Sequence, residues 1–180
     1  MCRGSEISQI LKFLHDFQDS FYEVKEIPQE EAPEDSRFLE IALKEALKAK
    51  HTGEVPVGAL LVINEQIISR AHNHVEARRD PTAHAELMVI KESLRKTGKK
   101  YLSGAILYVT LEPCLMCFKA ASLARIHKIV FMLHSDEGFT NYPVKSAYPR
   151  QITKITGNLS ETYEKILKDF FEKLRQKQRQ

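Results

Sequence analysis

Two cysteines three residues apart, Cys114 and Cys117, follow a histidine, His84, by 30 residues along the chain. Thiolate and imidazole are common zinc ligands, and a catalytic zinc takes three protein ligands and keeps a fourth position open. Glu86, two residues after the histidine, is the acid and base that such a site needs. The pattern predicts one Zn²⁺ per chain, and it requires a fold that brings two distant segments together.

A helix start is predicted at each half of this pattern. Pro113 precedes the first cysteine, and proline is well tolerated in a first turn because its missing N–H would have no partner there. We expect a helix over residues 113–124, with both cysteines at the positive end of its dipole, where a thiol pKa falls. Asp80-Pro81-Thr82 predicts a second helix, which runs to about Lys96 and carries the histidine and the glutamate in its first turn.

Two other roles of a C-x-x-C pair fit the sequence less well. A redox dithiol accompanies a thioredoxin-like pattern and needs no upstream histidine and glutamate. A structural zinc needs a fourth Cys or His at the spacing of a finger or ribbon, and the third cysteine, Cys2, lies near the N-terminus. The following histidines have no paired spacing with Cys114: His51, His72, His74, His127 and His134. A catalytic zinc is therefore favoured.

Composition limits the class of protein. The chain has 180 residues, of which 43% are hydrophobic and 28% charged, and this suits one globular domain with a buried core. No apolar run approaches the roughly 20 residues that span a bilayer, and no secretory signal is visible. Three cysteines make no disulfide framework. We expect reduced thiols, a cytoplasmic location and no membrane partner.

The net charge of +3 is unevenly distributed. Residues 1–36 hold three basic and nine acidic side chains, so residues 37–180 carry a net charge of +9. A basic body suits a polyanionic partner, although a lysine-rich soluble surface explains it equally well. The last eight residues contain no acid and four basic side chains, which suit either phosphate or a solvated helix end: Lys173, Arg175, Lys177 and Arg179.

The chain divides into an N-terminal part, residues 1–35, and a body, residues 36–180. Apolar residues at spacings of three and four predict an amphipathic helix over residues 7–22, which packs on the body or on a partner. Residues 26–35 are acidic and twice interrupted by proline, so they are interpreted as a linker.

Helices and strands alternate in the body, which indicates a single layered α/β domain. Besides the two helices above, the expected elements are a helix over 36–50, a strand over 57–63 with a hairpin turn at 64–66 into 67–69, strands over 105–110, 128–133 and 151–156, and a last helix from about residue 160.

Longer segments around the predicted ligands carry a resemblance: Glu54-Val55-Pro56-Val57-Gly58-Ala59, Asn73, residues 80–86, residues 107–117, and residues 155–173 with Asp169-Phe170-Phe171. Together they resemble bacterial tRNA-specific adenosine deaminases, within the cytidine deaminase-like superfamily, whose signature is H-x-E…P-C-x-x-C. The likeness covers roughly residues 36–175.

The resemblance implies a fold and a metal site. The implied fold is a three-layer cytidine deaminase-like α/β fold with a five-stranded mixed sheet between helices, assembled as a homodimer. It also implies one zinc per subunit held by His84, Cys114 and Cys117, with Glu86 as the proton shuttle.

Four residues are implied to bind substrate. Asn73 would hydrogen-bond the base or sugar of a flipped nucleotide, and Val57 would line the base pocket. The backbone N–H of Ala85 would face the base edge, and Pro113 is counted with these residues.

The implied reaction converts adenosine to inosine in a tRNA anticodon loop, without an organic cofactor. Phe118-Lys119-Ala120 and Met132-Leu133-His134-Ser135 depart from the family pattern, so a deaminase of a free base or nucleoside (guanine, cytosine, cytidine or adenosine) remains the alternative. A zinc-stabilised RNA-binding module and a protein-interaction subunit that uses the N-terminal helix are the non-enzymatic alternatives.

Overall fold

The computed structural model describes residues 22–144 and 146–178. Within these ranges, none of the helices combines the length and the apolar composition that a bilayer crossing requires. The elements are, in chain order, β1 (Lys25–Pro28), the 3-10 turn η1 (Gln29–Glu31), α2 (Pro33–His51), β2 (Gly58–Ile63), β3 (Gln66–His72), α3 (Val75–Arg78), α4 (Ala85–Thr97), β4 (Ile106–Val109), α5 (Leu115–Leu123), β5 (Lys128–Phe131), the 3-10 turn η2 (Phe139–Asn141), β6 (Gln151–Thr156) and α6 (Asn158–Gln178).

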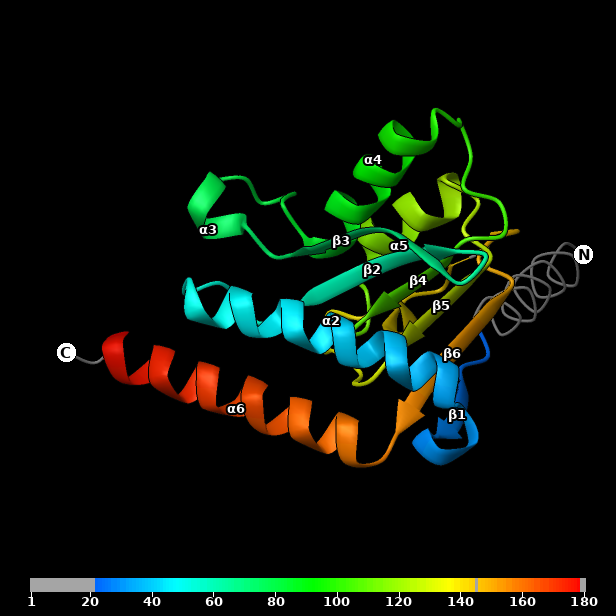
Figure 1. Cartoon of the computed structure of the whole chain (residues 1–180). Helices are drawn as coiled ribbons and strands as arrows, with labels where there is room; N and C mark the ends of the chain where they lie inside the picture. Colours follow the sequence, from blue (N-terminus) through cyan, green and yellow to red (C-terminus); the bar gives the residue numbers. More distant parts are fainter. Residues whose placement is uncertain (1–21, 145, 179–180) are drawn as a thin grey trace, which may run out of the picture.

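One mixed sheet runs through the molecule in the order β1-β6-β5-β4-β2-β3. Strands β1, β6, β5 and β4 run parallel to one another, whereas β2 is antiparallel to both of its neighbours, β4 and β3. Helices α4 and α5 cover one face, and α2 and α6 cover the other (Figure 1). The predicted three-layer α/β fold is confirmed.

Over the described residues the sheet has six strands, so the expected number of five is wrong. The extra strand is β1, which pairs in parallel with β6 from Lys25 opposite Thr153 to Pro28 opposite Thr156. Three of its four residues belong to the segment 26–35, which we interpreted as an acidic linker. Pro28 has no N–H to donate to a neighbouring strand. An edge strand tolerates this, because one of its sides has no neighbouring strand to bond.

The body helices and strands that were predicted all occur, with shifted ends. Helix α2 begins at Pro33 instead of near Ser36, because Pro33 itself occupies the first turn, where proline is tolerated. The hairpin turn consists of Asn64 and Glu65, both with positive φ (49° and 61°), as a two-residue primed turn requires. The N-terminal helix expected over residues 7–22 lies, except for Tyr22, outside the described residues.

The backbone of α2 rests directly on β2 at Gly58. A Cβ at this position would overlap Ala42 O and would lie 2.5 Å from Ala46 N. The helix carries Phe38 and Leu39, which are buried with Tyr108 between this face of the sheet and α6. Close contact at Gly58 therefore fixes the height of α2 above the sheet.

Substitution of Gly58 by alanine is expected to lower the free energy of unfolding by about 3 kcal/mol, the upper end of the usual range for overpacking, because the backbone of α2 must move away from β2. Gly104→Ala is the control, since a Cβ there meets nothing within 4 Å and only its φ of 82° is unfavourable, at about 1 kcal/mol. Urea unfolding of both variants measures the difference. Equal losses would contradict the close helix–sheet contact.

Candidate metal centre

The predicted metal ligands lie at the starts of two helices on the same face of the sheet. His84 is the N-cap of α4, and Cys114 is the N-cap of α5. Cys117 lies in the first turn of α5. The positive ends of both helix dipoles therefore point at one site, which stabilises thiolate there.

Both helices start later than the sequence predicted. Residues 80–82 form a separate turn, in which Asp80 Oδ1 accepts the N–H of Thr82 (2.8 Å) and its hydroxyl (2.7 Å). His84 is therefore at the cap and not inside the first turn. Pro113 is buried before α5, and its carbonyl accepts the N–H of Phe139 (3.0 Å).

The three ligand atoms are spaced as zinc requires. His84 Nδ1 lies 3.8 Å from Cys114 Sγ and 3.6 Å from Cys117 Sγ, and all three atoms lie within 4.8 Å of one another. In a tetrahedral zinc site, bond lengths of about 2.3 Å to sulfur and 2.0–2.1 Å to nitrogen place these atoms about 3.6 Å apart. One imidazole and two sulfurs at this spacing fit a catalytic Zn²⁺.

Hydrogen bonds among the ligands set their protonation. The bond with Cys117 lowers the pKa of Cys114 to about 4, with His84 contributing, although burial acts in the opposite direction. The same bond and burial raise the pKa of Cys117. The pKa of His84 is raised chiefly by its hydrogen bond with Cys114. This direction of the Cys114 pKa favours the thiolate, which is the form that binds metal.

Glu86 is buried beside the ligands, with 4% of its surface exposed. Its Oε2 has no hydrogen-bond partner among the described residues. Burial raises the pKa of this carboxyl, although a hydrogen bond to its own backbone acts in the opposite direction. A buried carboxylate oxygen without a partner is costly, and Oε2 of Glu86 therefore remains available as an acid or base beside the predicted ligands.

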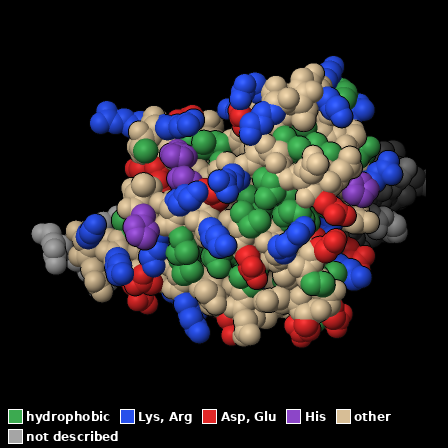
Figure 2. Space-filling view, in the orientation of Figure 1, with side chains coloured by type: hydrophobic (Ala, Val, Ile, Leu, Met, Phe, Trp, Pro, Cys, Tyr) green, Lys and Arg blue, Asp and Glu red, His purple; other side chains and the backbone are tan. Residues whose placement is uncertain are grey.

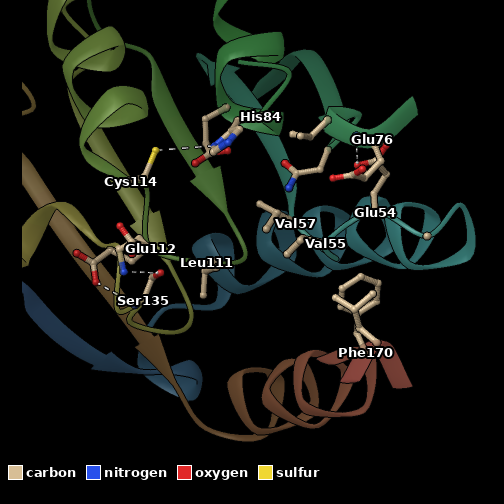
Figure 3. Close-up of a pocket in the computed structure, with 16 residues that line it drawn as sticks. Glu54, Val55, Val57, Glu76, His84, Leu111, Glu112, Cys114, Ser135 and Phe170 are labelled. Carbon is tan, nitrogen blue, oxygen red and sulfur yellow. Dashed lines mark hydrogen bonds between the residues drawn. The ribbon is translucent and has the colours of Figure 1, made fainter. Parts of the chain in front are cut away.

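A cavity of about 480 Å³ opens onto this centre (Figure 3). Among its lining residues are His84, Cys114 and Glu86, together with Val57 and Asn73, two of the predicted substrate-binding residues. Their roles toward substrate stay predictions, but the fold does bring them to the metal centre.

Asn73 and Ala85 interact with each other. Asn73 Oδ1 accepts the Ala85 N–H at 2.9 Å, so this N–H, predicted to face the base edge, here bonds within the protein. Because the acceptor oxygen must face that N–H, the amide orientation is fixed, and Nδ2 is the donor that Asn73 retains. Ala85 and Pro113 do not line the cavity, and their assignment to substrate stays a prediction.

Several cavity residues were not singled out as site residues. Val55, Leu111 and Phe170 add apolar walls, and Phe170 reaches the cavity from α6, on the other side of the site from His84 (Figure 3). The sequence signal for Phe170 was its place in the Asp169-Phe170-Phe171 segment. Glu54 also lines the cavity and fixes α3 by accepting two backbone N–H groups.

The comparisons with known proteins agree with this geometry. Residues 32–133 match the family model of the cytidine and deoxycytidylate deaminase zinc-binding region. The chain is 47% identical over 152 residues to the tRNA-specific adenosine deaminase of Aquifex aeolicus, covering 77% of this chain and 94% of that protein. It is 42% identical over 151 residues to the Bacillus subtilis protein of the same name, covering 81% and 94%.

Solved structures share the fold as well. A structure of tRNA:A34 deaminases, studied for A-to-I editing at the wobble position of transfer RNA, aligns with a TM-score of 0.62 and 34% identity, over 73% of this chain and 99% of that one. Guanine deaminase from Bacillus subtilis aligns with a TM-score of 0.54 and 28% identity, over 78% and 93%.

Replacing Cys117 by serine is expected to weaken zinc binding by more than about 100-fold. Mutation of a residue that only hydrogen-bonds a metal ligand already lowers metal affinity by about 10–100-fold, and loss of a ligand itself has a larger effect. Zinc content after dialysis against a chelator measures this loss. Cys2→Ser is the control, since Cys2 is outside the predicted ligand set. This variant is expected to retain the metal. Full zinc in the Cys117 variant would contradict the assigned centre.

Proposed function

We propose that this chain, which belongs to the family of zinc-binding cytidine and deoxycytidylate deaminases, hydrolyses the exocyclic amine of adenosine in a tRNA anticodon loop and leaves inosine. The observation that supports the proposal is Glu86, whose Oε2 has no partner among the described residues, in one cavity with the imidazole of His84 and the thiol of Cys114, beside Cys117. Relatives at 42–47% identity are tRNA-specific adenosine deaminases. A homodimer in the cytoplasm is part of the proposal.

Glu86 moves the protons of this reaction. When bound, zinc supplies a nucleophilic water at neutral pH. Glu86 would accept the two protons of the attacking water one after the other at Oε2, passing the first to the ring nitrogen and the second to the amine, which leaves as ammonia while the oxygen stays on the ring. Since burial raises the pKa of Glu86, its carboxyl can hold a proton nearer to neutral pH than an exposed glutamate, as a group that both accepts and donates requires.

The cavity suits a single flipped base. Its apolar walls, Val55, Val57, Leu111 and Phe170, provide surfaces against which a base can stack. Asn73 adds a donor in the cavity wall. A base in a single-stranded loop is also less costly to flip out than a base in a duplex.

A basic hollow adjoins the cavity at the end of α6. It is lined by Lys50, Lys173 and Lys177 and shares Phe170 with the cavity. Figure 2 shows Lys and Arg side chains at this end of α6. Lys50 and Lys173 also pair with Asp169. Phosphate contacts dominate nucleic-acid affinity, so a hollow of this charge favours an RNA substrate over a free base.

A deaminase of a free base is the second candidate, and one observation favours it. Glu137 lines the cavity and adds a carboxylate acceptor. The ring N–H of guanine is a donor that this carboxylate could bind, whereas the corresponding nitrogen of adenine is an acceptor.

Substitution of Glu86 by glutamine is expected to lower kcat by about 10²–10⁴-fold, because the amide cannot carry the proton. Zinc content and fold are expected to stay unchanged, since the amide keeps the shape of the side chain. Glu65→Gln, in the exposed hairpin turn, is the matched control and retains full turnover. Unchanged turnover in the Glu86 variant would remove the proposed mechanism, whereas a wild-type protein that binds RNA without any turnover would favour the RNA-binding module.

The substrate is tested by incubating the purified protein in parallel with bulk tRNA, adenosine, cytidine and guanine. Inosine is expected from tRNA alone, because the basic hollow contributes only when phosphates are present. Chromatography of the products scores inosine, uridine and xanthine. Conversion of guanine, cytidine or free adenosine without conversion of tRNA would replace the first candidate by the second.

A further inference from the structure

The loop between β5 and β6 (residues 132–150, of which 145 is not described) forms one wall of the substrate cavity. Ser135 and Glu137 of this loop line the same cavity as Glu86. Figure 3 shows Ser135 next to Glu112, across the site from Phe170. The position of this loop therefore shapes the space that a base would occupy.

Backbone bonds join the loop to the segment that carries the metal ligands. The N–H of Glu112 donates to Leu133 O (2.8 Å), and the N–H of Phe139 donates to Pro113 O (3.0 Å). Cys114 pairs with the loop in an isolated antiparallel bridge to residue 138. These backbone bonds fix the position of the loop relative to residues 112–114.

The loop winds around one buried carboxylate. Glu112, whose side chain has 0% exposure, accepts hydrogen bonds from Thr140 N (2.9 Å), Ser135 N (3.3 Å) and His134 Nδ1 (2.8 Å). A Cβ at Gly138 would overlap the same carboxyl group, so only glycine allows the loop to approach this closely.

Tyr22, at the N-terminal end of the described chain, reaches the same loop through an aromatic cluster. Its ring lies edge-on to Phe118 (5.1 Å between centroids) and to Phe139 (6.2 Å), and these two rings stack on each other at 4.2 Å. Phe118 follows Cys117 in α5, whereas Phe139 belongs to the loop. The Tyr22 hydroxyl also donates to Ser146 O at 2.8 Å.

Glu26 of β1 reaches the loop from the other side. Its Oε1 lies 2.9 Å from Lys154 Nζ in β6 and 3.8 Å from His134 Nε2. The ring of His134 therefore lies between two carboxylates, that of Glu26 and that of Glu112.

We infer that the segment Tyr22–Pro28 is a positioning element that holds the β5–β6 loop against the metal-ligand segment and so sets Ser135 and Glu137 in the cavity wall. The segment contacts Phe118 and His134, which belong to the two stretches that depart from the family pattern. These departures and the N-terminal segment thus form one packed unit. The expected effect on substrate rests on the proposed function, whereas the effect on the loop rests on geometry alone.

The principal test is Tyr22→Ala in the full chain. Loss of the ring removes two aromatic contacts, so deuterium exchange of the backbone over residues 132–142 is expected to speed up about tenfold. KM is expected to rise about tenfold while kcat stays within about twofold, because the altered wall binds ground state and transition state alike. Tyr22→Phe keeps the ring and is expected to restore wild-type exchange and KM.

A second variant keeps the test decisive where Tyr22→Ala fails to fold. Glu26→Ala is expected to speed up loop exchange and raise KM about threefold, since its ion pairs are partly exposed. Glu23→Ala is the matched control, because Glu23 is an exposed acid in the same segment and is expected to behave as wild type.

The inference would be overturned if the Glu26 variant, and the Tyr22→Ala variant where it folds, showed the same loop exchange and KM as the wild-type protein. A fall in Tm alone, which is the signature of a merely structural role, would overturn it as well. A wild-type protein that converts none of the tested substrates contradicts the proposed function instead, and loop exchange then still decides the positioning role.

Discussion

His84 and Cys114 each cap a helix on the same face of the sheet, and the convergence of these two helix starts is the constraint on which the site depends. The ligand atoms lie within 4.8 Å although their residues are 30 positions apart. Buried side chains of α4 and α5 pack in one cluster against β2, β4 and β5. The sheet therefore preorganises the metal centre, and binding of the ion needs no large rearrangement.

Glu86 shows what this preorganisation costs. A buried polar atom without a partner destabilises a fold by about 1–3 kcal/mol, and Glu86 Oε2 is such an atom within the described part of the chain. Two apolar layers, one on each face of the sheet, offset this cost. The molecule thus keeps a buried titratable group in its cavity at the expense of local stability, as is common at functional sites.

The sequence predicted the parts that depend on local spacing. The C-x-x-C pair with an upstream histidine predicted that these three side chains meet, which the structure shows, and the turn residues predicted the hairpin. Strand β1 was missed because four residues with acidic neighbours show no periodicity, and only the free edge of β6 makes them a strand. Tyr22 and Glu112 were missed for a similar reason, since Tyr22 bonds a residue 124 positions away and Glu112 is satisfied only once the loop has folded around it.

Strand β1 also changes what the sheet presents to other molecules. Without it, β6 would expose a row of unpaired backbone groups between Ile152 and Ile155, and such an edge invites strands from neighbouring chains. The strand that replaces it at the edge of the described sheet is four residues long, begins with Lys25 and Glu26 and ends in Pro28. Short length, charge and proline all discourage further strand addition. The N-terminal segment thereby guards the protein against edge-to-edge aggregation.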